Sequence, residues 1–364
     1  MVKEVDPASF GGDVALIDVR TAGEFEAAFI PGAVSLPLDV IAGRIADVVG
    51  DRDQTIVLYC NSGINSVIAG RFLDMLGYTD VASMTGGLVR WSKEGRPIEG
   101  TSRLTPEQRT RYSRHLSLDE VGEEGQRRLR SAGVVVVGAG GLGSPVALYL
   151  AAAGIGRLTV IDFDEVELSN LQRQIAHDTP SVGQSKAASA ADRVAALNPD
   201  VVVNGIQSRL TAANALDVLA DHHLIIDATD DFPTRYLIND AALHLGTPVV
   251  HGSILRFEGH ATVLWPGRGP CYRCLFPTPP TDAPTCEDAG VLGAMAGMIG
   301  SIQALETIKL ITGAGKPLIG TLLTYDGLDH TVTRFEYDRR PDCASCSGPL
   351  PELTDYDASC QPRY

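Results

Sequence analysis

One segment, GVVVVGAGGLGSPVALYLAAAG, limits the fold more than any other part of the chain. It has the pattern of a buried strand, a glycine-rich turn and a helix, an order typical of a nucleotide-binding α/β domain. Glycines let backbone N–H groups and the helix N-terminus approach phosphate oxygens, and the turn supplies Gly138, Gly140, Gly141 and Gly143. Asp162 ends the next strand, where a carboxylate can accept hydrogen bonds from ribose hydroxyls. Taken alone, the segment predicts a dinucleotide site, and its simplest interpretation is an NAD-dependent dehydrogenase.

Three further groups favour a triphosphate over a nicotinamide. Asn170 and Arg173 lie three residues apart on one helical face, and Lys186 lies near a helix start. Asp227 and Asp230 follow a strand in DATDD, where a carboxylate suits Mg²⁺. Each has a simpler explanation, because Arg173 and Lys186 can be solvated helix charges and Asp230 can be a helix N-cap. All are expected at one edge of the same sheet, beside the glycine turn, so they suit a triphosphate with Mg²⁺ better than a nicotinamide.

Apolar runs alternate with helical patterns along the first part of the chain, which predicts a small α/β domain. Uninterrupted apolar runs at 14–19 and 55–60 are typical of parallel strands that are buried on both faces. We expect this domain to span 1–98 and to end in a linker, 99–106, that is rich in Gly, Pro and Ser or Thr.

The second domain, 107–348, is expected to be doubly wound α/β, since strands and helices continue to alternate after the glycine turn. Segments 260–267 and 330–338 have the alternation of antiparallel edge strands. We expect the last residues, 349–364, to form a mobile tail.

Charge and hydropathy exclude several classes of partner. The chain has 364 residues and a net charge of −15 without a basic domain, so we expect no nucleic acid partner. The N-terminus, MVKEVDPASFGGD, has no apolar signal core, which predicts a cytoplasmic protein. The uncharged run 131–156 divides into a strand and a helix that are both short for a bilayer, so no membrane partner is expected. A second uncharged run, 289–305, indicates a buried helix pair or a subunit interface.

The seven cysteines are an odd number, which argues against a disulfide framework. Two C-x-x-C pairs supply four thiolates, the number that a closed tetrahedral zinc site needs: Cys271, Cys274, Cys343 and Cys346. A redox C-x-x-C or accidental cysteines are the alternatives. Folding must bring the two distant pairs together for zinc to bind. Three thiols are left over: Cys60, Cys286 and Cys360.

From about residue 104 to 348 the chain resembles the MoeB/ThiF family of ATP-dependent adenylyltransferases, relatives of ubiquitin-activating enzymes that act on small sulfur-carrier proteins. The resemblance rests on eight motifs in order: RYSRH, GAGGLG, DFDEVELSNLQRQ, VGQSK, DATD, GPCYRC, TCEDAGV and CASC. It implies a Rossmann-like adenylyltransferase domain with a structural zinc site, and a homodimer as the active form.

The resemblance also implies roles for individual residues. Asp162 would hold the ATP ribose, with Asp164 nearby. The α-phosphate and its neighbours would be bound by Asn170, Arg173 and Lys186. Asp230 would organise Mg²⁺, and Arg114 would reach the phosphates in the other subunit as an arginine finger. Asp231 stands where relatives commonly have Asn. Cys286 would lie in a crossover loop and take part in sulfur transfer or in a transient bond to the carrier.

Residues 8–98 resemble a rhodanese domain, through LIDVRTAGEFEAAFIPGAVSLPL, YCNSGINS and GGLVRWSKEGRPI. The resemblance implies that Cys60 carries a persulfide in a loop of backbone N–H groups ahead of a helix, whose dipole stabilises an anion. A buried structural cysteine is the alternative. Rhodanese relatives usually carry Arg at the positions of Asn61 and Asn65, so we expect weak activity on thiosulfate and a preference for a protein persulfide donor.

Together these features predict an enzyme that adenylates the C-terminal carboxylate of a ubiquitin-like sulfur carrier ending in Gly-Gly. Persulfide on Cys60, loaded by a cysteine desulfurase or a similar donor, would then give a thiocarboxylate and AMP. A nicotinamide-dependent oxidoreductase with a sulfur-binding rhodanese module is the alternative. A third possibility is a rhodanese module that only docks partners.

Overall fold

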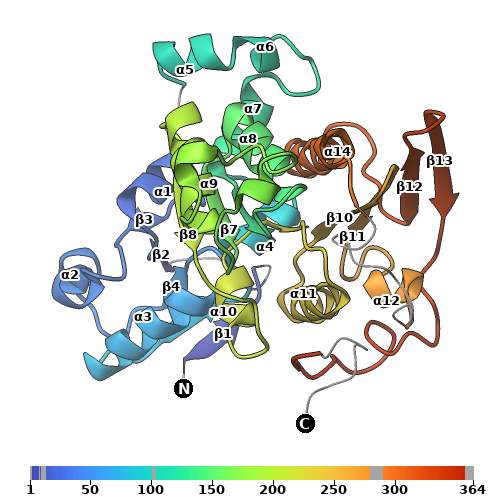
Figure 1. Cartoon of the computed structure of the whole chain (residues 1–364). Coiled ribbons are helices and arrows are strands. Elements are labelled where there is room, and N and C mark those ends of the chain that lie inside the picture. The colour runs from blue at the N-terminus through green and yellow to red at the C-terminus, as the bar shows by residue number, and fades with distance from the viewer. Residues whose placement is uncertain (1, 8, 10–13, 101–103, 279–289, 357–364) are drawn as a thin grey trace. The chain divides into compact units, whose positions relative to one another are not determined.

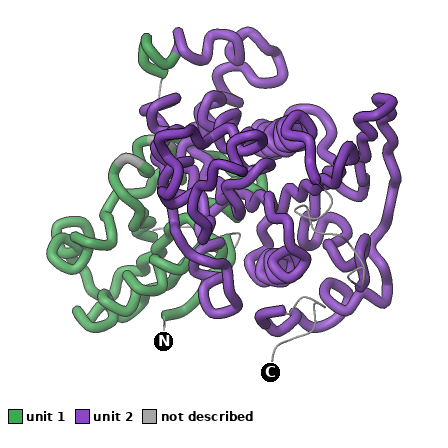
Figure 2. The backbone as a smooth tube through the Cα atoms, in the orientation of Figure 1, with its two compact units in different colours: residues 1–108 green, residues 109–364 purple. Residues whose placement is uncertain are grey.

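The computed structural model describes the chain except residues 1, 8, 10–13, 101–103, 279–289 and 357–364. Two compact units, Met1–Gln108 and Arg109–Tyr364, divide it (Figure 2). The boundary falls just after the predicted linker, 99–106. Each unit is described by itself below.

The first unit contains a parallel sheet in the strand order β1-β5-β4-β2-β3. Its strands are β1 (Lys3–Val5), β2 (Ala15–Asp18), β3 (Val34–Ser35), β4 (Ile56–Tyr59) and β5 (Val81–Met84). Its helices are α1 (Ala22–Ala27), α2 (Ile41–Val48), α3 (Ile64–Met75) and α4 (Gly87–Lys93). Every residue of β4 is buried, because separate hydrophobic clusters cover the two faces of the sheet. The apolar runs at 14–19 and 55–60 are therefore central strands, as predicted.

The second unit contains an eight-stranded sheet in the order β13-β12-β11-β10-β9-β6-β7-β8 (Figure 1). Five strands are parallel: β6 (Gly133–Val137), β7 (Arg157–Ile161), β8 (Val202–Ile206), β9 (Leu224–Asp227) and β10 (Val249–Leu255). Three antiparallel strands extend the sheet: β11 (Glu258–Leu264), β12 (Thr321–Asp326) and β13 (Thr331–Glu336). The predicted antiparallel character of 260–267 and 330–338 is confirmed by β11 and β13.

Helices cover both faces of this sheet. The longer ones are α7 (Gly122–Ser131), α8 (Gly143–Ala153), α9 (Lys186–Leu197), α11 (Phe232–Leu245) and α14 (Gly293–Thr312). Shorter helices are α5 (Pro106–Arg111), which crosses the unit boundary, α6 (Ser113–Leu116), α10 (Ala215–Leu219), α12 (Tyr272–Leu275), η1 (Leu168–Asn170) and η2 (Thr179–Ser181). Alternate residues of β6 enter different cores, since Val134 and Val136 pack with α8 and α14 residues while Val135 and Val137 pack with α11 residues. The strand after which the glycine turn begins is thus fixed from both sides.

Helix α14 accounts for most of the second uncharged run, 289–305. Among the described residues it is the one helix long and apolar enough, by length and composition, to cross a membrane. Its buried polar groups form hydrogen bonds within the domain. Gln303 Nε2 donates to Asp227 O at 2.7 Å, and Glu306 Oε2 accepts from Leu318 N at 2.8 Å. These contacts are those of a core helix, which agrees with the predicted burial.

The C-terminal segment differs from the mobile tail expected for 349–364 over the part that the structure describes. Asp355 Oδ1 accepts a hydrogen bond from Ala212 N at 2.7 Å, and Pro351 O accepts one from His244 Nε2 at 2.6 Å. Tyr356 is buried in the same core as α11. Composition pointed to a tail, but one tyrosine and two polar contacts hold the segment against the domain.

Candidate active sites

The glycine turn between β6 and α8 leaves no room for side chains at two positions. A Cβ on Gly143 would lie 1.8 Å from Gly138 O, and one on Gly138 would lie 2.7 Å from Ala228 O. Gly138 also has φ of 99°, a conformation that other residues adopt only with strain. Gly141 lies beside the Arg173 side chain, since its Cβ would be 3.6 Å from Arg173 Cγ. The turn therefore presents backbone N–H groups next to an arginine.

Asp162 lies directly after β7 and is linked to the glycine turn. Its Oδ2 accepts a hydrogen bond from Ala139 N at 2.8 Å, and its Oδ1 accepts one from Asp164 N at 2.8 Å. Burial raises the pKa of Asp162, although these backbone donors oppose the shift. A carboxylate has about four acceptor positions, so two remain for other donors. Asp162 thus shapes the turn and keeps acceptor capacity.

Lys186 begins α9 and pairs with Asp164. The Nζ–Oδ2 distance is 2.8 Å, and the Lys186 side chain is 10% exposed while that of Asp164 is 45% exposed. Ser185 caps the helix by accepting a hydrogen bond from Ala188 N. The alternative that Lys186 is a solvated helix charge is wrong, because its side chain is buried and its ammonium group is paired with the Asp164 carboxylate.

Asn170 and Arg173 lie at and just after η1. Asn170 is buried and its Oδ1 accepts a hydrogen bond from Glu167 N at 3.1 Å. The half-buried Arg173 donates from Nη1 to Ser169 O at 3.2 Å, and its aliphatic part lies beside Gly141. Arg173 therefore lies beside the turn, where its guanidinium remains partly exposed to solvent.

Of the three aspartates at the carboxyl end of β9, Asp227 and Asp231 accept hydrogen bonds within the domain. Asp227 is buried and accepts from Thr229 Oγ1 at 2.6 Å and from His251 Nδ1 at 2.7 Å. Burial acts to raise the pKa of Asp227, but His251, Arg235 and the Thr229 hydrogen bond together lower it. The helix N-cap is Asp231, which accepts from Thr234 N at 2.8 Å, so the alternative that Asp230 caps α11 is wrong.

Asp230 is exposed and makes no hydrogen bond or ion pair with the residues that the structure describes. It lies between the buried Thr229 and the cap of α11, at the carboxyl end of the parallel sheet. Arg114 is likewise exposed, in α6. Both side chains face solvent in the single chain.

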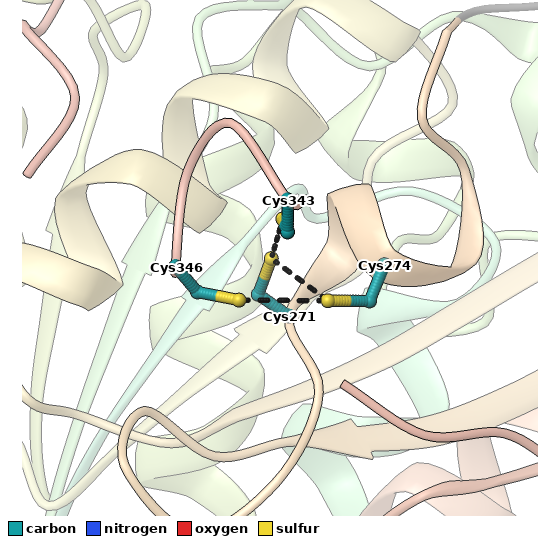
Figure 3. Close-up of side chains that lie close together, drawn as sticks. All are labelled: Cys271, Cys274, Cys343 and Cys346. Carbon is teal, nitrogen blue, oxygen red and sulfur yellow. Dashed lines mark hydrogen bonds between the residues drawn. The ribbon is translucent and has the colours of Figure 1, made fainter. Parts of the chain in front are cut away.

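The four cysteines of the two C-x-x-C pairs meet as predicted (Figure 3). Cys271 Sγ lies 3.8 Å from Cys274 Sγ and 3.5 Å from Cys343 Sγ. Cys274 Sγ lies 3.5 Å from Cys346 Sγ. All four lie within 4.8 Å of one another. Burial and the neighbouring thiols raise the pKa of Cys271. The arrangement can hold one metal ion.

Cys60 lies at the carboxyl end of β4, in the loop before α3. Its side chain is buried, Gly63 N donates to Sγ at 3.1 Å, and Ser66 Oγ lies 3.7 Å from Sγ. Gly63, whose N–H contacts the sulfur, has φ of 104°, a conformation that other residues adopt only with strain. The N-terminus of the twelve-residue α3 follows at once. The predicted strand, turn and helix around Cys60 are present, and they favour an anionic sulfur.

The loop around Cys60 contains no cationic side chain from Cys60 to Ser66. Asn61 is buried, with Nδ2 donating to Glu24 Oε1 at 3.0 Å and Oδ1 accepting from Arg20 Nη1 at 3.3 Å. Arg20 is itself paired with Asp18 at 2.5 Å. Burial acts to raise the pKa of Glu24, but hydrogen bonds from Thr21 and Asn61 lower it, so Glu24 is ionised at neutral pH. A neutral amide, hydrogen-bonded to both Glu24 and Arg20, thus stands where the resemblance leads one to expect an arginine.

Cys286 and Cys360 lie outside the described residues. Two residues that sequence reasoning missed do contribute to the nucleotide-binding end of the sheet. His177 bridges Ala139 O at 3.0 Å and Ser189 Oγ at 3.0 Å, and His251 holds Asp227. Their sequence contexts, IAHD and VVHG, carry no spacing signal, because each contact depends on the tertiary fold.

Comparisons with known proteins identify the family of each part of the chain. The model of the ThiF family matches residues 112–345, and the model of the rhodanese-like domain matches residues 1–94. The sulfur carrier protein adenylyltransferase of Thermus thermophilus is 49% identical over 268 residues, 71% of this chain and 98% of that relative. The SAMP-activating enzyme E1 of Haloferax volcanii is 50% identical over 260 residues, 71% of this chain and 96% of that relative.

A third relative combines two activities in its name. The probable adenylyltransferase/sulfurtransferase MoeZ of Mycobacterium tuberculosis is 46% identical over 269 residues, 72% of this chain and 68% of that relative. A solved structure of E. coli MccB with ATP is similar with a TM-score of 0.59 and 21% identity, over 71% of this chain and 80% of that chain. At this identity the likeness concerns the fold.

The predicted fold class, family and enzyme class are confirmed by these matches, and the dehydrogenase interpretation is not supported. The ThiF match covers more than half of the chain, and the Thermus relative is matched over nearly its whole length. The chain therefore belongs to the ThiF family and carries a rhodanese-like domain ahead of its ThiF domain.

Proposed function

We propose that this enzyme adenylates the C-terminal carboxylate of a ubiquitin-like sulfur-carrier protein and then transfers sulfur to it from a persulfide on Cys60. The observation that carries the proposal is the cluster at the glycine turn, where Arg173 lies beside Gly141 and Lys186 lies 2.8 Å from Asp164. Two fixed cations beside open N–H groups suit a polyphosphate. The names of the Thermus and Haloferax relatives support a carrier protein as the substrate.

In the adenylation step, the carrier carboxylate attacks the α-phosphate of ATP and pyrophosphate leaves. The glycine turn and the N-terminus of α8 receive the phosphates, since both present N–H groups there. Lys186 and Arg173, with Asn170 nearby, bind the phosphates and stabilise the charge that develops during attack. Asp162 accepts from the ribose through its two remaining acceptor positions, and Asp164 orients Lys186.

Mg²⁺ neutralises the phosphate charge when it is bound. Asp230 fits this ion, because it is an exposed carboxylate with no partner among the described residues, at the carboxyl end of the sheet. Arg114 is exposed on α6 and would contact the phosphates of a second subunit, so we propose a homodimer as the active form.

We propose zinc as the ion of the four-cysteine cluster. Four thiolates are a typical structural zinc set, and Zn–S bonds of about 2.3 Å in a tetrahedron place the sulfurs about 3.8 Å apart. Three of the observed separations, 3.5 to 3.8 Å, are close to that value, and all four sulfurs lie within 4.8 Å of one another. The ion joins the two C-x-x-C segments and has no contact with the reacting atoms in this proposal.

In the sulfur-transfer step, the nucleophile is a persulfide carried by Cys60. The terminal sulfur of the Cys60 persulfide attacks the acyl carbon, and AMP leaves with the electron pair of the broken C–O bond. A thiolate then attacks Cys60 Sγ, which forms a disulfide and releases the thiocarboxylate. Cys286 is our candidate for this thiolate, and an external dithiol then reduces the disulfide. Reduction of this kind suits the cytoplasm.

We propose a protein persulfide, such as that of a cysteine desulfurase, as the donor for Cys60. Thiosulfate is a dianion, and it would meet the neutral Asn61 where the resemblance leads one to expect an arginine. The two charged partners of Asn61 are Glu24, which is ionised, and Arg20, which is already paired with Asp18. A persulfide carried by a protein needs no cation at the loop, because its docking energy comes from the rest of the protein surface.

The test is thiocarboxylate formation by the purified chain with MgATP, a Gly-Gly carrier and a desulfurase with L-cysteine, followed by intact mass. Cys60→Ala should abolish thiocarboxylate while leaving carrier-dependent ATP–pyrophosphate exchange within about twofold of the original enzyme. Full thiocarboxylate formation by Cys60→Ala would remove the sulfur relay from the proposal.

A further inference from the structure

Asp240 is a fully buried carboxylate in α11 to which the proposed reactions assign no role. Its Oδ1 accepts hydrogen bonds from Asn239 Nδ2 at 2.9 Å and from Ser345 Oγ at 3.1 Å. Its Oδ2 accepts one from Tyr356 OH and lies 3.6 Å from Arg273 Nη2. A buried carboxylate destabilises the fold when it has no such partners. Loss of any of these four partners should therefore destabilise this part of the fold.

The partners of Asp240 come from both halves of the four-cysteine centre. Arg273 lies inside the first C-x-x-C pair, and Ser345 lies inside the second. The residue before Asp240 adds a further link, because Asn239 Oδ1 accepts a hydrogen bond from Tyr272 N at 2.8 Å. One turn of α11 is therefore bonded to both segments that supply the sulfurs.

The C-terminal segment closes this arrangement. Tyr356 OH accepts a hydrogen bond from Arg273 Nη2 at 2.9 Å while it donates to Asp240. Its ring lies 6.0 Å from that of Tyr236, which is in α11 one turn before Asp240. Tyr236 OH in turn donates to Phe276 O at 2.8 Å, just after α12. The part of the chain expected to be a tail thus completes the contact between α11 and the cysteine centre.

The other end of α11 lies at the proposed magnesium position. Asp231 caps the helix, and Arg235 Nη2 donates to Thr229 O at 2.8 Å, on the other side of Asp230. Asp240 is eight residues beyond Phe232, the first residue of α11, which is about 12 Å along a continuous helix that begins two residues after Asp230. A single helix therefore connects the residues around Asp240 to the N-cap that follows Asp230.

We propose that Asp240 is a positioning residue that joins α11 to the zinc centre and thereby holds Asp230 in place for MgATP. The coupling to MgATP depends on the proposed function, whereas the joint to the zinc centre does not. Zinc occupancy and ATP affinity are then linked through α11, and Tyr356 strengthens the link by bonding to both Asp240 and Arg273.

The test compares Tyr356→Phe with a matched control, Tyr325→Phe, in the full-length zinc-loaded enzyme. Tyr325 is a buried tyrosine of β12 whose OH lies 2.5 Å from Nδ1 of the exposed His330, so the control also loses a tyrosine hydroxyl and a partly buried hydrogen bond. Zinc release to a chromogenic chelator and binding of a non-hydrolysable ATP analogue with Mg²⁺ are measured on both variants. Asp240→Asn, which keeps the shape and removes the charge, is the second test variant.

We expect Tyr356→Phe to release zinc about ten times faster, since a hydrogen bond to a charged group is lost. We expect its dissociation constant for the MgATP analogue, and its KM for MgATP in pyrophosphate exchange, to rise at least threefold with kcat within twofold. Tyr325→Phe should change none of these. Asp240→Asn should have effects at least as large as Tyr356→Phe.

Zinc release by Tyr356→Phe at the control rate would overturn the joint. Faster zinc release with unchanged ATP affinity would overturn the link to Asp230. If the enzyme without substitutions shows no carrier-dependent exchange, the proposed function fails, and the zinc measurements still decide whether Asp240 joins α11 to the cysteine centre.

Discussion

Replacing Lys186 with Met separates a catalytic role from a structural one. Met keeps the apolar stem that α9 buries and removes the ammonium group. Its partner, Asp164, is 45% exposed, so water solvates the carboxylate that loses its partner. A pair of this kind contributes about 1 kcal/mol to stability, which predicts a small fall in melting temperature.

The predicted effect on the reaction is much larger. A fixed cation that stabilises charge in a transition state contributes about 3 to 4 kcal/mol, equivalent to a loss of about 10² to 10³ in kcat. The assay is carrier-dependent ATP–pyrophosphate exchange at saturating MgATP, with melting temperature measured on the same preparation. We therefore expect at least a hundredfold loss of exchange from Lys186→Met in a protein of nearly unchanged stability.

Lys309→Met is the matched control for this prediction. Lys309 Nζ lies 2.5 Å from Glu306 Oε1, but Glu306 is buried, with a side chain that is 4% exposed. Removing its partner leaves a buried carboxylate and should cost about 3 kcal/mol of stability while exchange is retained at low temperature. If Lys186→Met keeps exchange within tenfold of the original enzyme, the assignment of Lys186 to the phosphates is refuted.

Two further predictions concern sulfur transfer and acid stability. The double substitution Asn61→Arg with Asn65→Arg should raise thiosulfate turnover at Cys60 at least tenfold, since two cations then attract the dianion. An unchanged rate would show that charge at this loop does not select the sulfur donor. Burial, followed by the nearby charge of Arg157, lowers the pKa of His222 to about 4, compared with 6.5 in the unfolded chain. The unfolded state therefore binds more protons between these values, and stability falls by about 3 kcal/mol as pH drops from 6.5 to 4. Urea unfolding of His222→Gln should lack that part of the pH dependence, whereas an identical pH profile would mean that His222 is not the group responsible.

The sequence predicted the elements whose signals are local. The order of β6, the glycine turn and α8 follows from consecutive residues, because valines that alternate between two cores precede glycines that cannot bear a Cβ. The two C-x-x-C pairs also have a local signal each. The two pairs come together only when the chain folds. Their proximity was still predictable, because four thiolates together form the ligand set of one tetrahedral metal ion.

Contacts made by the tertiary fold were not predictable in the same way. The sequence around Asp240 contains no signal that predicts its hydrogen bonds with Ser345 and Tyr356. The composition of 349–364 predicts a mobile tail. Asp230 and Asp231 are neighbours with the same side chain, so sequence alone could not tell which one caps α11. The structure separates them, because only Asp231 accepts a hydrogen bond from Thr234 N.

The central claim is that this chain activates a carrier carboxylate with ATP. Its most direct test is ATP–pyrophosphate exchange with MgATP and small proteins from the source organism that end in Gly-Gly. We predict exchange that requires the carrier and is lost when its C-terminal glycine is removed, with Arg173→Ala as the inactive control. Exchange that proceeds equally without a carrier, or that survives removal of the C-terminal glycine, would contradict the account.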